Sequence, residues 1–327
     1  MNAKITATSH NVPKNIMTNH DLEKIVNTSD EWIQSRTGIM QRYVVGPNEA
    51  SSNMSIRIAE DLLEKRGISA KEIDLIIIGT VTPDYYTPST AALVQNSIGA
   101  HNAWGYDLSA ACSGFIYGIE TGCNFITSGK YEKIMIIGVD TMTAVLDFQD
   151  RDTCVIFGDG GGGVILEPTK NHAGIIDSKM YMDGSGGEYL IIPGGGSKIP
   201  ATKESVEKRQ HYIKQDGKTV FKRAVKGMAD VSKELLVRNN LKGEDIALFI
   251  PHQANKRIID ATAERCGISK EKILINIDKY GNTTAGTIPI ALNEAFDEKR
   301  INEGDYILLS AFGAGFTWGS LLIKWEN

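Results

Sequence analysis

Two stretches of this chain share one pattern of apolar and polar residues. Residues 59–77 read AEDLLEKRGISAKEIDLII and residues 232–250 read SKELLVRNNLKGEDIALFI, and the two align without a gap. In each stretch, apolar residues recur every three or four positions and a short apolar run follows a polar turn. This pattern predicts an amphipathic helix followed by a buried strand. Repeated helix–strand units of this kind favour a duplicated α/β fold.

The repetition continues towards the C-terminus. Two further pairs of predicted strands recur at nearly the same separation: residues 103–108 with 273–278, and residues 133–137 with 305–309. We therefore place a boundary between two halves, residues 1–172 and 173–327. The order of elements predicts a mostly parallel sheet covered by helices in each half. Residues 178–220, rich in glycine and polar residues, are expected to be an insertion or a cover over an active site.

Composition excludes several classes of protein. A formal net charge of −5 argues against general affinity for nucleic acid. The four cysteines (112, 123, 154 and 266) form no CxxC pair and no metal-ligand spacing, which suits a reducing compartment and predicts no metal site. The N-terminal residues do not resemble a signal peptide, and the longest apolar runs are too short to cross a bilayer. We expect a cytoplasmic protein that does not bind membranes.

Cys112 is a candidate nucleophile. A predicted strand ends at Leu108, small residues follow, and an amphipathic helix is expected to begin near Cys112. The partial positive charge of a helix N-terminus is expected to lower the pKa of the thiol. The alternative is a cysteine buried in the core, which is the commoner fate of this residue.

His252 and Asn282 are candidate partners of the thiol. Each follows a predicted strand, and ligands bind beyond the carboxyl ends of strands in such sheets. Taken singly, His252 could be an ordinary loop residue and Asn282 a turn or helix cap. The duplication changes this interpretation, because it predicts that Cys112 and Asn282 occupy matching positions at facing helix N-termini. All three side chains would then meet in one pocket.

A glycine-rich run, GDGGGG at residues 158–163, formally fits the dinucleotide-binding pattern GxGxxG. It joins two strand-like runs and does not open a helix, so we do not predict nucleotide binding there.

Several motifs resemble one family closely. They are ACSGF (111–115), PHQAN (251–255), YGNTTAG (280–286), FGAGFTWGS (312–320), TSDEWIQSRTGI (28–39) and DRDTCVIFGDG (150–160). Together they resemble the β-ketoacyl-[acyl-carrier-protein] synthase III enzymes of bacterial fatty-acid synthesis. The resemblance spans the chain and implies the thiolase fold: two similar halves, each with a mixed five-stranded sheet, layered α-β-α-β-α, in a homodimer.

The resemblance also implies a reaction. Cys112 would accept an acyl group from acyl-CoA, and His252 and Asn282 would serve the decarboxylative condensation with malonyl-acyl-carrier protein, with no other cofactor. Two neutral N–H donors suit the negative charge that develops on the thioester oxygen. The backbone N–H groups of Cys112 and Ala314 would form a second oxyanion hole. Many family members have glycine in place of Ala314, whose methyl group could narrow the pocket.

Further roles follow from the resemblance alone. Coenzyme A or substrate contacts are expected at Trp32, Arg36, Arg151, Gly217, Asn255 and Thr87. Carrier-protein contacts are expected at Gln253, Lys256, Arg257 and Lys222. Thr87 stands where family members often carry phenylalanine at the end of the acyl pocket, which suggests room for a longer or branched primer unless Tyr85 or Tyr86 fills the space.

Three other functions stay open. A related condensing enzyme of secondary metabolism would use the same triad with another primer or acceptor. A cysteine hydrolase also uses Cys, His and Asn, but the duplicated halves argue against it. A noncatalytic acyl-CoA-binding relative would not need an intact triad.

Overall fold

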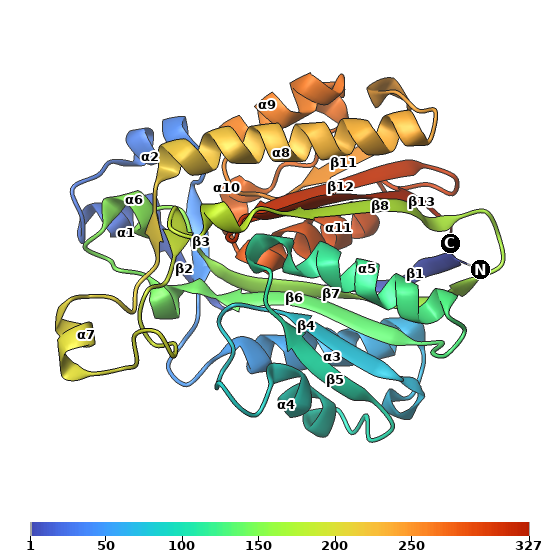
Figure 1. Ribbon diagram of the computed structural model, residues 1–327, viewed down its shortest axis with the longest axis horizontal. Helices are drawn as coiled ribbons and strands as arrows, with labels where there is room; N and C mark the ends of the chain where they lie inside the picture. The colour runs from blue at the N-terminus through green and yellow to red at the C-terminus, as the bar shows by residue number, and fades with distance from the viewer. Residues whose placement is uncertain (1, 327) are drawn as a thin grey trace.

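The protein folds into five layers in the computed structural model, which describes residues 2–326 (Figure 1). Helices and sheets alternate through the molecule, and the two sheets enclose a central layer of helices. The outer helices on one side are α3 (Ser51–Arg66) and α4 (Thr90–Ser97), the central ones are α5 (Gly114–Thr127) and α11 (Thr287–Asp297), and those on the other side are α8 (Gly217–Arg238) and α9 (Lys256–Cys266).

The two sheets repeat one topology. The first has the order β1-β7-β6-β4-β5 and the second the order β8-β13-β12-β11. In the first sheet β4 runs parallel to β5 and β6, and in the second β11 runs parallel to β12. The strands are β1 (Asn2–Asn11), β4 (Leu75–Gly79), β5 (Trp104–Leu108), β6 (Ile134–Thr141), β7 (Asp159–Thr169), β8 (Gly174–Met182), β11 (Leu248–Pro251), β12 (Tyr306–Gly313) and β13 (Thr317–Lys324).

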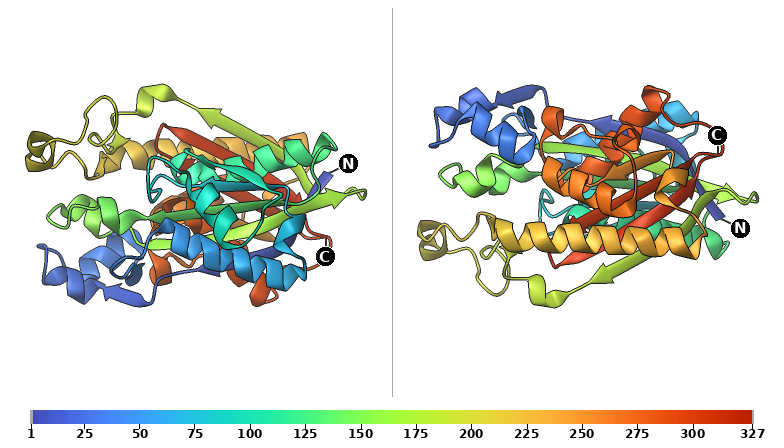
Figure 2. Two further views of the ribbon diagram at one scale, coloured as in Figure 1. Left: turned by 90° about the horizontal axis from the view of Figure 1, so that it is seen from below. Right: turned by 90° about the horizontal axis from the view of Figure 1, so that it is seen from above.

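The remaining elements gather mainly at one end of the molecule (Figure 2). They are β2 (Asn15–Thr18), α1 (Asn19–Glu23), α2 (Asp30–Thr37), β3 (Gln41–Val44), α6 (Arg151–Cys154), β9 (Leu190–Ile191), α7 (Lys203–Glu207), β10 (Lys214–Gln215) and α10 (Ile277–Tyr280). Short 3₁₀ turns complete the chain: η1 (Ala70–Glu72), η2 (Ala111–Ser113), η3 (Met142–Val145), η4 (Gly184–Gly186), η5 (Gly243–Asp245), η6 (Lys270–Lys272) and η7 (Thr284–Gly286).

The repeat seen in the sequence extends to backbone detail. The turn η2 leads into α5, and η7 leads into α11 at the separation that also relates residue 59 to residue 232. Ala111 and Thr284, which open these turns, share an unusual positive φ of 48° and 50°. The residue that matches Cys112 is therefore Ala285, and the predicted match between Cys112 and Asn282 is wrong by three positions. The proposed boundary after residue 172 falls between β7 and β8.

One predicted strand is largely missing. Residues 273–278 contribute a single bridge, between Ile273 and Phe249, before α10 begins. The backbone N–H of Asn276 donates to the side chain of Gln253 (3.1 Å), and the Asn276 amide donates to Glu294 (2.7 Å). Gln253 therefore takes the place of a neighbouring strand at the backbone N–H of Asn276. The second sheet therefore has four strands rather than the predicted five.

The central layer brings the two halves into close backbone contact. A Cβ atom added to Gly138 on β6 would collide with the carbonyl group of Ala285, and one added to Gly313 would lie 2.7 Å from the backbone nitrogen of Cys112. These contacts require residues without side chains, since a close-packed interior cannot yield the space for one. Between residues 2 and 326, no helix combines the length and the apolar character needed to span a membrane.

Candidate active site

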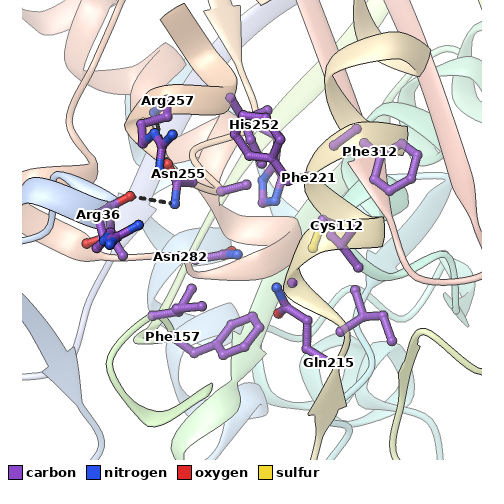
Figure 3. Close-up of a pocket in the computed structure, with 18 of the residues that line it drawn as sticks. Arg36, Cys112, Phe157, Gln215, Phe221, His252, Asn255, Arg257, Asn282 and Phe312 are labelled. Carbon is purple, nitrogen blue, oxygen red and sulfur yellow. Dashed lines mark hydrogen bonds between the residues drawn. The ribbon is translucent and has the colours of Figure 1, made fainter. Parts of the chain in front are cut away.

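Cys112, His252 and Asn282 line one cavity of about 600 Å³. Cys112 lies in η2 after β5, His252 follows β11 directly, and Asn282 lies between α10 and η7. Their side chains point toward a common space (Figure 3). The structure thus brings together the three side chains that the sequence placed at separate strand ends.

The Cys112 thiol is buried, with 7% of the residue exposed, close to the N-terminus of the 14-residue helix α5. Burial, and to a lesser degree the charge of Asp140, raises the pKa of this thiol above its ordinary value. The expected lowering of the pKa is therefore wrong, because desolvation disfavours the thiolate more than the helix end favours it. The resting nucleophile is a neutral thiol.

His252 is also neutral. Only 1% of the residue is exposed, and burial lowers the pKa of its imidazole to about 3. Its Nδ1 atom lies 2.7 Å from the hydroxyl oxygen of Thr287, and its backbone N–H donates to Ser310 (2.8 Å). Within residues 2–326, Nε2 has no hydrogen-bond partner. That atom is left to face the cavity.

Asn282 is held from three directions. Its backbone N–H donates to Ile156 (3.0 Å), and its carbonyl accepts from Gly158 (3.1 Å). Its side-chain oxygen accepts the backbone N–H of Thr284 (2.8 Å), which assigns the amide orientation. The NH₂ group donates to no atom of the described chain and is therefore free to bind a ligand oxygen in the cavity.

Asp140 anchors the turn that carries Asn282, a role that sequence reasoning missed. This fully buried carboxylate accepts from the backbone N–H of Val81 (2.8 Å) and the hydroxyl of Thr82 (2.8 Å) in the first half. Its other oxygen accepts from the Thr284 hydroxyl and from the Ala285 N–H (3.2 Å) in the second half. An aspartate inside the apolar strand IMIIGVDT was the available signal, because a buried acid needs several donors.

The turn between β12 and β13 lies beside the nucleophile. The Thr317 hydroxyl lies 3.0 Å from the carbonyl oxygen of Ala110 and 3.1 Å from that of Ala314, and it ties the two segments together. Apart from the Cys112 thiol beside its own backbone nitrogen, the backbone N–H groups of Cys112 and Ala314 have no acceptor in the part of the chain that the structure describes. Both are available for the oxyanion hole that the resemblance implies.

Four residues expected to contact coenzyme A or carrier protein also line the cavity, namely Arg36, Gly217, Asn255 and Arg257. The Asn255 amide donates to the carbonyl of Arg36 (3.0 Å) and so connects α9 with α2. Trp32 and Arg151 do not line this cavity but lie on the flanking helices α2 and α6. The Arg151 guanidinium stacks over the Trp32 ring at 4.7 Å from its centroid.

The segment 178–220 contributes to the cavity as expected of a cover. Leu190, Gln215 and Lys218 line it, and all three precede or open α8. Phe157, Phe221 and Phe312 give it apolar walls. These aromatic residues were missed, since single phenylalanines in a sequence are more simply interpreted as core.

Two predicted site residues lie elsewhere. Gln253 is 1% exposed, and its amide donates to the carbonyls of Pro251 (2.8 Å) and Leu274 (3.2 Å). It cannot contact a carrier protein in this position, so that prediction is wrong. Thr87 is exposed and does not line this cavity. Lys222 and Lys256 are exposed as expected, although Lys256 forms an ion pair with Asp260 (2.8 Å).

The lowered pKa of His252 predicts how stability depends on pH. Between pH 6.5 and about 3, the unfolded state binds a proton on this imidazole and the folded state does not. The free energy of unfolding therefore falls as pH falls through this window, by up to about 1.4 kcal/mol per pH unit from this group. Urea unfolding of His252→Gln at pH 4 to 6.5 should show a shallower pH dependence than the wild type. An unchanged slope in His252→Gln would contradict the assignment.

Comparisons with known proteins agree with this geometry. A family model described as 3-oxoacyl-[acyl-carrier-protein (ACP)] synthase III matches residues 106–184, and the model of its C-terminal region matches residues 236–325. The β-ketoacyl-[acyl-carrier-protein] synthase III of Chlorobaculum tepidum is 54% identical, with 100% of both chains aligned. The enzyme of the same name from Solibacter usitatus is 52% identical over 99% of this chain and 98% of its own.

The fold agrees as well. The crystal structure of 3-oxoacyl-[acyl-carrier-protein] synthase III from Aquifex aeolicus superimposes with a TM-score of 0.92 at 43% identity, covering 99% of this chain and 100% of that one. The predicted family and thiolase fold are thereby confirmed. Because family models match both halves and the relatives named above align over their full length, the chain belongs to the 3-oxoacyl-[acyl-carrier-protein] synthase III family.

Proposed function

We propose that Cys112 carries the acyl primer and that His252 and Asn282 then stabilise the enolate formed from malonyl-acyl-carrier protein. The chain is a condensing acyltransferase that initiates fatty-acid synthesis, as its family membership establishes. The roles proposed for Cys112, His252 and Asn282 rest on one observation. Two neutral side chains with an unpaired nitrogen each face the same cavity as the Cys112 sulfur.

Acylation comes first in this scheme. The Cys112 sulfur attacks the thioester carbon of acyl-CoA, the bond to the coenzyme A sulfur breaks, and the thiol proton leaves with the departing thiol. The backbone N–H groups of Cys112 and Ala314 bind the oxyanion of the tetrahedral intermediate. Because the resting thiol is neutral, we infer that the Cys112 thiol loses its proton during the attack, and that this proton ends on the coenzyme A thiol. The positive end of α5 then stabilises the sulfur's developing charge.

Condensation follows. The bond between the malonyl carboxylate and its methylene carbon breaks, carbon dioxide leaves, and the electron pair forms an enolate on the thioester oxygen. N–H groups of His252 and Asn282 donate to that oxygen. The enolate carbon attacks the acyl carbonyl on Cys112, a carbon–carbon bond forms, and the carbon–sulfur bond breaks with its electron pair on the Cys112 sulfur, which then takes up a proton from solvent to restore the thiol. A carboxylate side chain at this position would repel both the malonyl carboxylate and the enolate, whereas the neutral N–H donors of His252 and Asn282 stabilise the enolate charge.

Loading and condensation should separate by mutation. We expect Cys112→Ser to lose acyl transfer from acyl-CoA, because the thiol itself forms the new bond. Asn282→Ala should still load Cys112 but condense about 100- to 1000-fold more slowly, since one oxyanion donor is removed. Intact-protein mass spectrometry after incubation with mixed acyl-CoAs measures loading, and formation of the β-ketoacyl product measures condensation. Equal loss of loading in both variants would refute this division.

The Trp32–Arg151 pair is proposed to bind the nucleotide end of coenzyme A. An indole and a guanidinium stacked at 4.7 Å offer flat faces to an adenine, and the arginine can also pair with phosphate. Arg36 lies on the same helix as Trp32 and lines the cavity. It would therefore contact the part of coenzyme A that joins the nucleotide to the sulfur.

This assignment predicts a substrate-dependent defect. Trp32→Ala should raise KM for acyl-CoA about 2- to 30-fold with little change in kcat, because a contact worth about 0.5–2 kcal/mol is lost. The matched control is an acyl-pantetheine, which lacks the nucleotide. Its KM should be the same for the variant and the wild type. A comparable rise in KM for both substrates would place Trp32 outside the nucleotide site.

Carrier-protein binding is proposed for Lys222, Lys256 and Arg257. All three are exposed near the N-terminal ends of α8 and α9, and Arg257 also lines the cavity. On a chain with a net charge of −5, this cluster of positive charge could attract an acidic partner to the cavity mouth.

We further infer a homodimer that uses the edge of the first sheet. β5 has a neighbour on one side only, and its first residues are exposed. Trp104 is 44% exposed and packs against Phe125 and Tyr131 in an aromatic cluster. An unpaired edge with exposed aromatic surface favours pairing with a second copy. Because Thr87 lies outside the cavity of its own protomer, any role in an acyl pocket would require the second protomer.

Light scattering after gel filtration tests the dimer. The wild type should show twice the protomer mass of 35.7 kDa. Trp104→Lys should shift the protein toward monomer, because a charge would be buried in the contact. Val237→Lys, at an apolar position of α8 that is 75% exposed, should remain dimeric. A dimeric Trp104→Lys protein, or a monomeric wild type, would rule out this interface.

A further inference from the structure

We propose that Thr287 is a positioning residue that decides which ring nitrogen of His252 carries the proton. The inference rests on the proposed function, in which His252 must donate an N–H to the enolate oxygen. It adds a residue that touches neither substrate nor the reacting atoms, and it explains how a histidine without a carboxylate partner keeps its donor directed into the cavity.

The observation is a pair of contacts around one hydroxyl group. The Thr287 oxygen lies 2.7 Å from Nδ1 of His252 and 3.2 Å from the carbonyl oxygen of Thr284. A threonine hydroxyl has one proton, so it donates to one of these two atoms. The neutral imidazole also has one proton, on Nδ1 or on Nε2. The two choices are therefore coupled.

The two possible arrangements differ in chemistry. If Thr287 donates to its carbonyl partner, Nδ1 must supply the proton of its contact with the hydroxyl, and Nε2 faces the cavity as an acceptor. If Thr287 donates to Nδ1, the ring proton lies on Nε2 and faces the cavity as a donor. Only the second arrangement can stabilise an oxyanion.

Two features favour the second arrangement. A separation of 2.7 Å is typical for an O–H donor and short for an N–H donor, whereas 3.2 Å is long for an O–H donor. The carbonyl of Thr284 also accepts the backbone N–H of Thr287, so it does not need the hydroxyl. The Nδ1 lone pair has no donor other than Thr287 among residues 2–326. Donation to Nδ1 therefore satisfies both the ring nitrogen and the carbonyl.

The same turn orients the second donor. The backbone N–H of Thr284 binds the side-chain oxygen of Asn282 and leaves its NH₂ group toward the cavity (Figure 3). Asp140 fixes Thr284 and Ala285 through the Thr284 hydroxyl and the Ala285 N–H. Residues 284–287 thus act as one element that turns two N–H donors toward one point.

The protonation state can be observed directly. In ¹⁵N-histidine-labelled protein, long-range ¹H–¹⁵N spectra at neutral pH distinguish the two neutral forms of a ring, and the His252→Gln spectrum identifies the His252 signals by their loss. We expect the proton on Nε2 and a bare Nδ1 in the wild type. A proton on Nδ1 would overturn the proposal.

Kinetics of matched variants give a second measurement. Thr287→Val keeps the shape of the side chain but removes the hydroxyl, and Thr287→Ser keeps the hydroxyl. We expect Thr287→Val to condense about 10- to 100-fold more slowly, with acyl loading of Cys112 within about twofold of wild type. Thr287→Ser should restore condensation to within about threefold. Thr262→Val, which removes another buried helix hydroxyl that bonds only a helix carbonyl (2.8 Å), should leave both steps unchanged.

The outcomes separate this proposal from the function on which it rests. Wild-type protein that fails to load Cys112 or to condense would refute the proposed function itself. Wild-type protein that condenses, together with a Thr287→Val variant of normal condensation rate, would refute only the role of Thr287. Equal loss of loading and condensation in Thr287→Val and Thr262→Val would also refute it, because the effect would then be general damage to packing.

Discussion

The buried carboxylate of Asp140 connects the two halves of the molecule at the reaction site. One carboxylate oxygen accepts hydrogen bonds from Val81 and Thr82, which follow β4. The other accepts hydrogen bonds from the turn η7, which orients the Asn282 side chain. A buried acid is tolerated only when such donors surround it, and here the donors belong to segments from opposite halves of the chain. Asp140 therefore joins the loop after β4 to the turn that orients Asn282.

Burial also sets the charge state of the site. The cavity raises the pKa of the Cys112 thiol and lowers that of the His252 imidazole, so both are neutral at rest. A thiolate–imidazolium pair, as used by many cysteine hydrolases, is thus disfavoured by the same desolvation. What remains is a set of N–H donors around a sulfur. Such a site stabilises negative charge that appears on substrate oxygens during acyl transfer and decarboxylation.

The sequence allowed prediction of features that depend on local pattern, and not of those that depend on contacts between distant segments. The C-terminal part of helix α8 and strand β11 follow from apolar spacing, and Cys112 from its place between a strand and a helix. The missing strand at residues 273–278 depends on Asn276 binding Glu294 and Gln253. The burial of Gln253 likewise depends on its bonds to the carbonyls of Pro251 and Leu274. Neither the partner of His252, 35 residues away, nor the donors around Asp140 leave a local signal.

The corrected alignment of the halves explains why a duplicated fold can hold one active site. The positions that match Cys112 and Ala111 in the second half are Ala285 and Thr284, on a turn with the same positive φ. The first turn presents a thiol to the cavity. The second presents no nucleophile, and its polar groups instead bind Asp140 and the side chain of Asn282. The same backbone turn thus supplies the nucleophile in one half and orients the oxyanion donors in the other, because the two turns carry different side chains on one backbone shape.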